Sequence, residues 1–192
     1  MERQLSSFRL VFLVLSLLLF TSCLELKVTI NFRSETAGTV TLEALQYRMA
    51  KGINWENLAL PTTREGWSQV VVQVPGASVT SFELIPDDLG TRTKTVVTFA
   101  SIRALESLFV IYKQKLTLLQ DAQGKYNLVL QPLVPKLSAA AVETRKLWID
   151  LWGDSTWKFV VQPPGNPTGT VFTVTLRDLA AEKAPGEWKA SW

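Results

Sequence analysis

The chain has 192 residues, 47% of them hydrophobic, and its 20 Lys and Arg against 17 Asp and Glu give a net charge of +3. This composition fits one globular domain, and without a Lys/Arg cluster interleaved with aromatic residues it does not favour nucleic-acid binding. The absence of histidine excludes Ser-His-Asp and Cys-His catalysis and His-ligated zinc, and a single cysteine excludes an internal disulfide.

The first 22 residues have the features of an export signal. Arg3 and Arg9 place positive charge before residues 10–20, which are apolar except for Ser16. At ~1.5 Å per residue, a helix of that length is too short for the ~30 Å hydrocarbon core of a bilayer. The pattern therefore predicts the apolar region of a secretory signal peptide.

The apolar run ends in Phe20-Thr21-Ser22-Cys23. This segment resembles the lipobox of bacterial lipoproteins, in which small residues precede an obligatory cysteine, although Phe20 replaces the usual aliphatic residue. The resemblance implies a diacylglyceryl group on the Cys23 sulfur, cleavage before Cys23 and acylation of the new amino terminus. The alternatives are an ordinary signal peptide with a chance cysteine, or an uncleaved anchor. We expect a signal peptide at 1–22 and a mature domain at 23–192, lipidated at Cys23.

A hairpin is expected directly after Cys23. Apolar and polar residues alternate over residues 24–33, which is typical of a strand with one buried face. A turn follows at 34–38, and a second strand covers 40–49. Its alternation slips by one residue before Leu45, which predicts a β-bulge near Ala44.

Two helices are expected in the middle of the chain. Thr62 and Glu65 have the spacing of a capping box before a Val-rich segment, 67–74. Its apolar residues recur at helical spacing, so a helix is favoured over the alternative of a strand. Ser101 is suited to cap a second helix, with one apolar face that extends to Tyr112.

The remaining segments complete an α+β fold. A third helix is expected at 138–152, where dense apolar residues imply burial on more than one side. Further strands are expected at 79–85, 91–99, 115–120, 125–131, 156–162, 170–177 and 187–192. Hairpins separated by single helices predict one α+β domain of antiparallel sheet, with about three helices packed on one face.

The arrangement also resembles one family of envelope lipoproteins, the LppM-like, DUF3153-type proteins. The lipidated cysteine followed by "LKVTINFRSETAGTVTLEA", a helix leading to "PGASVTSFEL", and "VTFASIRAL" are the features that carry it, over residues 23–160. Many members have a C-terminal membrane helix, which is not seen here. The resemblance implies a role in the cell envelope, in binding or handling lipids or glycolipids, and it brings no catalytic motif.

Seven tryptophans are the remaining unusual feature of the sequence. Core packing is the default explanation for each of them. The alternative is an apolar pocket between sheet and helices, lined by Trp67, Phe109, Trp148 and Trp152, that takes an alkyl chain, a hydrophobic peptide or a partner protein. Trp148 and Trp152 are four residues apart and would share one face of the third helix.

Carboxylates are the only candidates for acid–base chemistry. Asp87 and Asp88 fall in an expected turn, while Asp150 and Asp154 flank Trp152 as a glycosidase-like pair would. No nucleotide-binding, metal-binding or hydrolase motif accompanies them.

The sequence as a whole predicts a non-enzymatic, cofactor-free protein, exported across the bacterial cytoplasmic membrane and held on the membrane by lipid. It would bind a lipid or other apolar ligand or dock an envelope protein. The alternatives are a structural or assembly lipoprotein and a carboxylate-based hydrolase.

Overall fold

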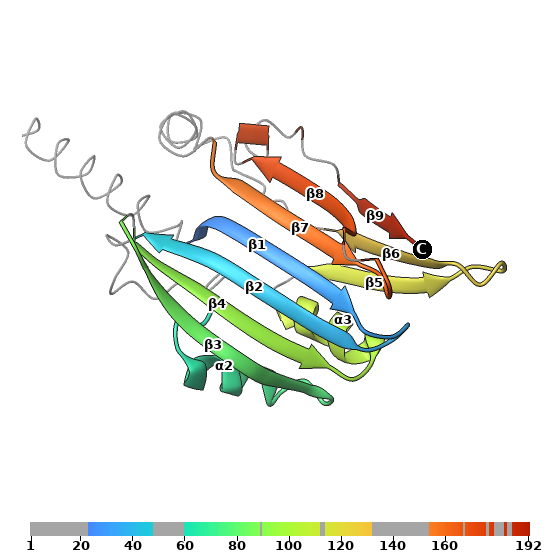
Figure 1. Cartoon of the computed structure of the whole chain (residues 1–192), viewed down its shortest axis with the longest axis horizontal. Coiled ribbons are helices and arrows are strands. Elements are labelled where there is room, and N and C mark those ends of the chain that lie inside the picture. The colour runs from blue at the N-terminus through green and yellow to red at the C-terminus, as the bar shows by residue number, and fades with distance from the viewer. Residues whose placement is uncertain are drawn as a thin grey trace, which may run out of the picture.

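Two sheets and two helices form the part of the chain that the structure describes (Figure 1). The structure is a computed structural model, and it describes residues 23–47, 60–88, 90–111, 114–131, 154–166, 168–175, 177–178, 183 and 186–192. The helices are α2 (Arg64–Val71) and α3 (Ile102–Ile111). The strands are β1 (Cys23–Phe32), β2 (Gly38–Tyr47), β3 (Ala77–Asp87), β4 (Gly90–Phe99), β5 (Lys115–Gln120), β6 (Tyr126–Gln131), β7 (Thr156–Gln162), β8 (Thr170–Thr175) and β9 (Trp188–Ser191).

The large sheet has six strands in the order β3-β4-β2-β1-β7-β8, and the small sheet has three in the order β5-β6-β9. In the large sheet β1 and β7 run parallel, and the other neighbouring pairs are antiparallel. Figure 1 shows both helices and the small sheet on the same side of the large sheet. The fold therefore has two layers, with the core between them.

Alternation along the strands decides which face of the large sheet is buried. In β1, Val28 and Ile30 are buried, and the residues between them are partly exposed. The register sets Val28 beside Leu42 of β2 and Phe159 of β7, so the buried residues of three strands form a continuous row. The same core includes buried residues of α2, α3 and the small sheet. The two layers therefore share one hydrophobic core.

The β1–β2 turn is closed by backbone and side-chain hydrogen bonds. The amides of Arg33 and Ser34 donate to the Ala37 carbonyl at 2.9 and 3.2 Å, and the Ala37 amide donates to Ser34 Oγ at 3.2 Å. A Cβ at Gly38 would clash with the Asn31 carbonyl oxygen, so the close approach of the two strands requires glycine there. The expected hairpin after Cys23 is confirmed.

Both helices in the described part begin at a capping side chain. Thr63 Oγ1 accepts from the Gly66 amide at 3.0 Å, so the cap of α2 lies one residue after the Thr62 that the sequence indicated. Ser101 Oγ accepts from the Ala104 amide at 3.2 Å, as expected for α3. Trp67 of α2 is buried at helical spacing from Val71, so the choice of helix over strand is confirmed.

The expected fold class is wrong. The described residues are mostly β, and they form a six-stranded mixed sheet and a separate three-stranded sheet instead of one antiparallel sheet under three helices. Local patterns locate strands and tight turns, but they do not show that β1 pairs in parallel with β7, more than 120 residues later. The expected third helix at 138–152 lies outside the described residues.

A register irregularity does lie next to Ala44, opposite Leu45 and Gln46, but its extra residue belongs to β1 and not, as the sequence predicted, to β2. β2 pairs without a register shift with β4 from Gly38 to Tyr47, and the shift in the β1–β2 pair falls between Cys23 and Glu25. Leu45 follows Ala44 in regular strand geometry, and both residues are buried. The apparent slip arises because consecutive residues of β2 are buried on opposite faces of the sheet.

Candidate membrane-anchoring end and apolar core

Cys23 is the first residue of β1, at one end of the large sheet. Its backbone lies opposite Gln46 of β2, so the strand pairing begins at the cysteine itself. The ordered sheet thus starts with no spacer after the residue that the lipobox pattern selects.

The expected signal peptide, 1–22, lies outside the described residues. Among the helices within the described residues, none is long and apolar enough to cross a membrane.

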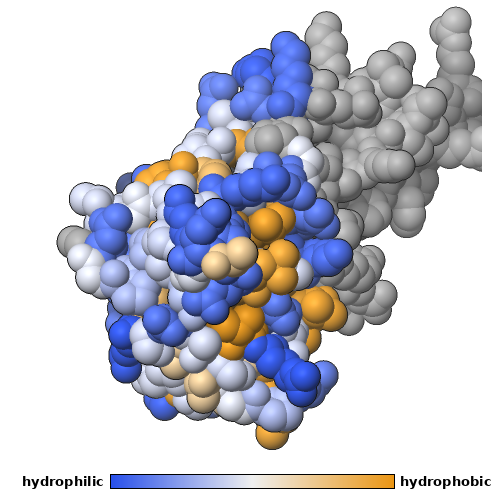
Figure 2. All heavy atoms as spheres, turned by 90° about the vertical axis from the view of Figure 1, so that its right-hand side faces the viewer, coloured by the Kyte–Doolittle hydropathy of each residue, from blue (hydrophilic) through white to orange (hydrophobic). Residues whose placement is uncertain are grey.

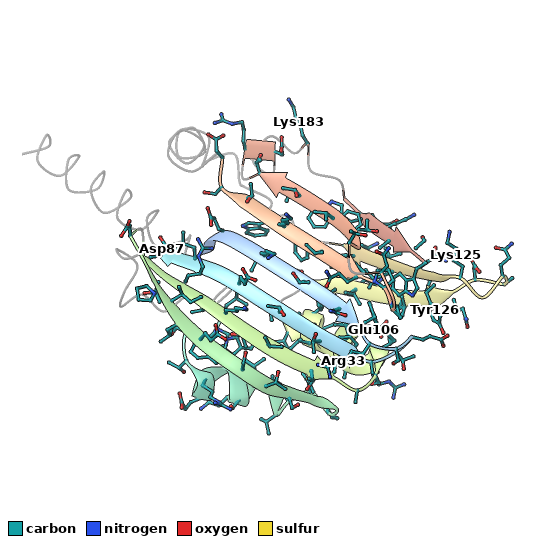
Figure 3. All side chains as sticks on the ribbon, in the orientation of Figure 1. Arg33, Asp87, Glu106, Lys125, Tyr126 and Lys183 are labelled. Carbon is teal, nitrogen blue, oxygen red and sulfur yellow. The ribbon has the colours of Figure 1, made fainter. Side chains whose placement is uncertain are left out.

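A small ion-pair network lies at the same end of the large sheet. The Arg92 guanidinium donates to the Glu25 carboxylate at 3.1 Å and to the Asp87 carboxylate at 3.3 Å. Burial lowers the pKa of Arg92, but its hydrogen bonds to Glu25 and Asp87 outweigh this effect and raise the pKa above the ordinary value. The arginine therefore stays charged and balances two carboxylates. Figure 3 labels Asp87 at this end of the sheet.

Of the four residues proposed to line a pocket, the structure describes two, Trp67 and Phe109. Trp67 of α2 is 1% exposed and Phe109 of α3 is 6% exposed, and both belong to the hydrophobic core. Trp148 and Trp152 lie outside the described residues. Core packing, the default explanation, thus accounts for the burial of Trp67 and Phe109.

Tryptophans near the C-terminus join the two sheets, a role that the sequence did not reveal. The Trp188 ring of β9 lies 4.9 Å from the Phe159 ring and stacks on Phe172 with a centroid distance of 5.5 Å. Trp188 lies on the inward face of β9 and is buried. The alternation Trp188–Ala190 was the available signal, but nothing in it identified β7 and β8 as the contacts.

A second aromatic chain crosses between the sheets at the end of the large sheet farthest from Cys23. Phe32 packs on Phe99 at 5.6 Å and on Trp192 at 5.0 Å between ring centroids. Trp192 stacks on Tyr126 at 6.0 Å, and the Tyr126 hydroxyl donates to Glu35 at 2.8 Å. The β5–β6 hairpin is thus fixed to the β1–β2 turn, and Figure 3 shows Tyr126 and Arg33 together at that end.

Buried polar side-chain atoms without a hydrogen-bond partner in the described structure include the Thr95 hydroxyl and the indole nitrogens of Trp157 and Trp192. Thr95 and Trp157 lie on the buried face of the large sheet. Thr93, also buried, makes only a long 3.5 Å bond to the Ala44 carbonyl. The core face therefore becomes more polar along β4 towards the Cys23 end.

The candidate acids lie at the surface wherever the structure describes them. Asp154 is 95% exposed and its carboxylate accepts from Arg177 at 3.3 Å, while Asp87 pairs with Arg92. Asp150, the other half of the glycosidase-like pair, lies outside the described residues. No group of three or more potential metal-ligating side chains is found within the described part of the chain.

The chain was also compared with known proteins. No family model, no curated protein and no solved structure matches it. The resemblance to the LppM-like lipoproteins thus remains a prediction from the sequence.

Proposed function

We propose that this chain is a lipid-anchored protein of the bacterial cell envelope, exported by a cleaved signal peptide at 1–22 and attached to the membrane through Cys23. The observation that carries the proposal is the position of Cys23. The lipobox-like segment ends at the residue where β1 begins. A domain attached there is held directly at the bilayer surface.

An acyl anchor at Cys23 would hold the domain on the membrane after the apolar leader has been removed. Each buried methylene of an acyl chain contributes ~0.8 kcal/mol, so a single chain gives marginal binding and two or three give stable attachment. A diacylglyceryl thioether supplies two chains, and an acylated amino terminus supplies a third. Cys23 provides both attachment points, its sulfur and its α-amino group, once the leader is removed.

The domain itself is proposed to act without catalysis, by docking a partner protein or holding an apolar ligand. The packed core supports partner docking, because Trp67 and Phe109 are buried and Trp188 fills space between the sheets. Exposed apolar side chains on α3 and β5 include Val110 and Leu119. Figure 2, which views the end of the molecule away from Asp87, shows hydrophobic residues gathered between hydrophilic ones.

A structural or assembly role is the second candidate, and the aromatic joint between the sheets favours it. Phe159, Phe172 and Trp188 interlock with ring centroids 4.9 and 5.5 Å apart, which is the packing of a filled interior. A ligand role would then fall to the segment with Trp148 and Trp152. Mass spectrometry of lipid that co-purifies with the domain 24–192 separates these candidates: bound lipid supports the ligand role.

The anchor is tested by substituting Cys23→Ala and following partition into the detergent phase. The parent chain should partition with detergent and carry the mass of a diacylglyceryl group, whereas the variant should stay aqueous or keep its leader. Ser22→Ala is the matched control, because it keeps a small residue before the cysteine and should be processed normally. A Cys23→Ala protein whose leader is removed as in the parent chain, and which still enters the detergent phase, would refute the lipoprotein assignment.

A further inference from the structure

The strand register places the β3–β4 hairpin at the level of Cys23. Cys23 lies opposite Gln46 of β2, Gln46 lies opposite Thr91 of β4, and Thr91 lies opposite Pro86 of β3. The hairpin then continues past this level through Asp87 and the turn. Figure 1 shows the β3–β4 turn reaching beyond the start of β1 at the same end of the sheet.

Two large apolar side chains are exposed on this hairpin. Leu84 is 56% exposed and Ile85 is 40% exposed, and they are consecutive residues of β3. At ~3.3 Å per residue along a strand, they lie within about 7 Å of the Pro86 level. The apolar residues of membrane-surface segments lie ~5–10 Å deep, around the boundary between headgroups and acyl chains. Asp87 and Asp88 lie beyond them at the turn, so Leu84 and Ile85 meet that zone when the edge strand β3 lies against the bilayer, with the two carboxylates among the headgroups.

The edge of β3 is poorly suited to pairing with a strand of a second copy. Its pairing with β4 is interrupted by a register shift between Val79 and Ser81, and Pro86 lacks an amide hydrogen. Glu83 adds a charge in the middle of the strand. These are the features by which natural sheets prevent edge-to-edge association. A strand of a second copy is therefore a poor partner for the exposed apolar residues on this edge.

Charge at the hairpin is partly balanced. Arg92 of β4 pairs with Asp87 at 3.3 Å and with Glu25 of β1 at 3.1 Å. Among the described residues of the hairpin the cations are Arg92 and Lys94, and Asp88 adds an exposed carboxylate, so no group of unpaired cations would draw it to anionic lipid. Contact with a bilayer would therefore depend on Leu84 and Ile85 and should occur on zwitterionic phosphatidylcholine.

We propose that the β3–β4 hairpin rests on the lipid bilayer, with Leu84 and Ile85 in the interfacial region, as a second contact beside the acyl chains of Cys23. This inference rests on the proposed lipid attachment at Cys23. With two contacts separated by the width of three strand spacings, the domain has a fixed orientation. The β5–β6 hairpin and the surface in Figure 2 then face away from the membrane.

The test uses lipidated full-length protein in phosphatidylcholine vesicles, with a polarity-sensitive fluorophore on an introduced cysteine. Cys23 is the only cysteine in the chain, so its lipidation leaves the introduced thiol as the only one to label. The variants are Leu84→Cys and Ile85→Cys. The matched control is Leu119→Cys, an equally exposed leucine at 63%, beside the Gln120–Tyr126 pair at the opposite end.

Labels at positions 84 and 85 should show blue-shifted emission and several-fold stronger quenching by acyl-chain-quencher lipids than the label at 119. Equal quenching at all three positions overturns the proposal. A blue shift without lipid quenching also overturns it, because burial of the labels against a second copy would give that result. A parent chain whose Cys23 takes up the label overturns the proposed lipid anchor as well. Lipidated protein without quenching at 84 and 85 overturns only the hairpin contact.

Discussion

The two ends of the large sheet are built differently. At the end far from Cys23 the core face carries Phe32 and Phe99, which contact each other and reach the small sheet through Trp192. Along β4 towards the Cys23 end, the other core-facing residues include Thr95, in the middle of the strand, and Thr93. The far end of β4 thus contributes an aromatic ring to the core, while its middle and its Cys23 end contribute threonines.

This difference indicates where the domain is rigid. Aromatic contacts and the Tyr126–Glu35 hydrogen bond fix the small sheet to the far end of β1. At the Cys23 end, the β3–β4 hairpin exposes Leu84 and Ile85. Stability is thus concentrated away from the proposed membrane contact, and the end with exposed apolar surface is the one that a bilayer would cover.

The largest expected effect comes from breaking the aromatic end with Phe32→Ala. Phe32 is buried and contacts the rings of Phe99 and Trp192, so its loss leaves a cavity at the joint between the sheets. We expect the free energy of unfolding of 24–192 in urea to fall by about 3–5 kcal/mol. Leu119→Ala, at an exposed position, is the control and should change it by about 0.5 kcal/mol or less. A similar loss from both variants would contradict the proposed role of this aromatic chain.

The polar middle of the core face should respond to Thr95→Val with a gain in stability. The Thr95 hydroxyl is buried without a partner in the described structure, and a methyl group of similar volume removes its desolvation cost. The free energy of unfolding should rise by about 1 kcal/mol in urea denaturation. Thr93→Val on the same face should gain less, because Thr93 Oγ1 bonds to the Ala44 carbonyl. A loss of stability in Thr95→Val would indicate that the hydroxyl has a partner.

The sequence predicted the individual elements better than their assembly. The hairpin that follows Cys23, the helix capped by Ser101 and the strands flanking Gly124 follow from periods of two and 3.6 residues and from local turn and cap chemistry. The parallel β1–β7 pair and the division into two sheets depend on contacts between distant segments. No local pattern encodes those contacts, which is why the fold class was wrong.

For the candidate site, too, the sequence predicted local features but not contacts between distant segments. Cys23 was identified from contiguous residues, since a lipobox is a local signal, and its lipidation stays a prediction. Trp67 and Phe109 were proposed as pocket residues from their type and spacing, yet each is buried in the core. The β3–β4 hairpin was not identified, because the exposure of Leu84 and its level relative to Cys23 follow only from strand register.

The smallest effect is expected at the hydrogen bond that ties the β5–β6 hairpin to the β1–β2 turn. The bond that Tyr126 donates to Glu35 raises the pKa of the tyrosine above its ordinary value of about 10. The folded state therefore holds this proton more tightly than the unfolded chain does. The resulting stabilisation is fully present below about pH 10 and is lost as the pH rises through the folded-state pKa.

Tyr126→Phe removes this contribution while keeping the ring that stacks on Trp192. The variant should be slightly less stable than the parent chain at pH 8, and the difference should shrink above pH 10. Urea denaturation at both pH values measures it, and a double-mutant cycle with Glu35→Gln isolates the pair. Since the bond is exposed, its loss should be far smaller than that of Phe32→Ala. A gap between variant and parent that widens with pH would show that the hydroxyl does not act as the donor. A loss as large as that of Phe32→Ala would mean that the hydrogen bond, and not the stacked rings, fixes the hairpin at this end.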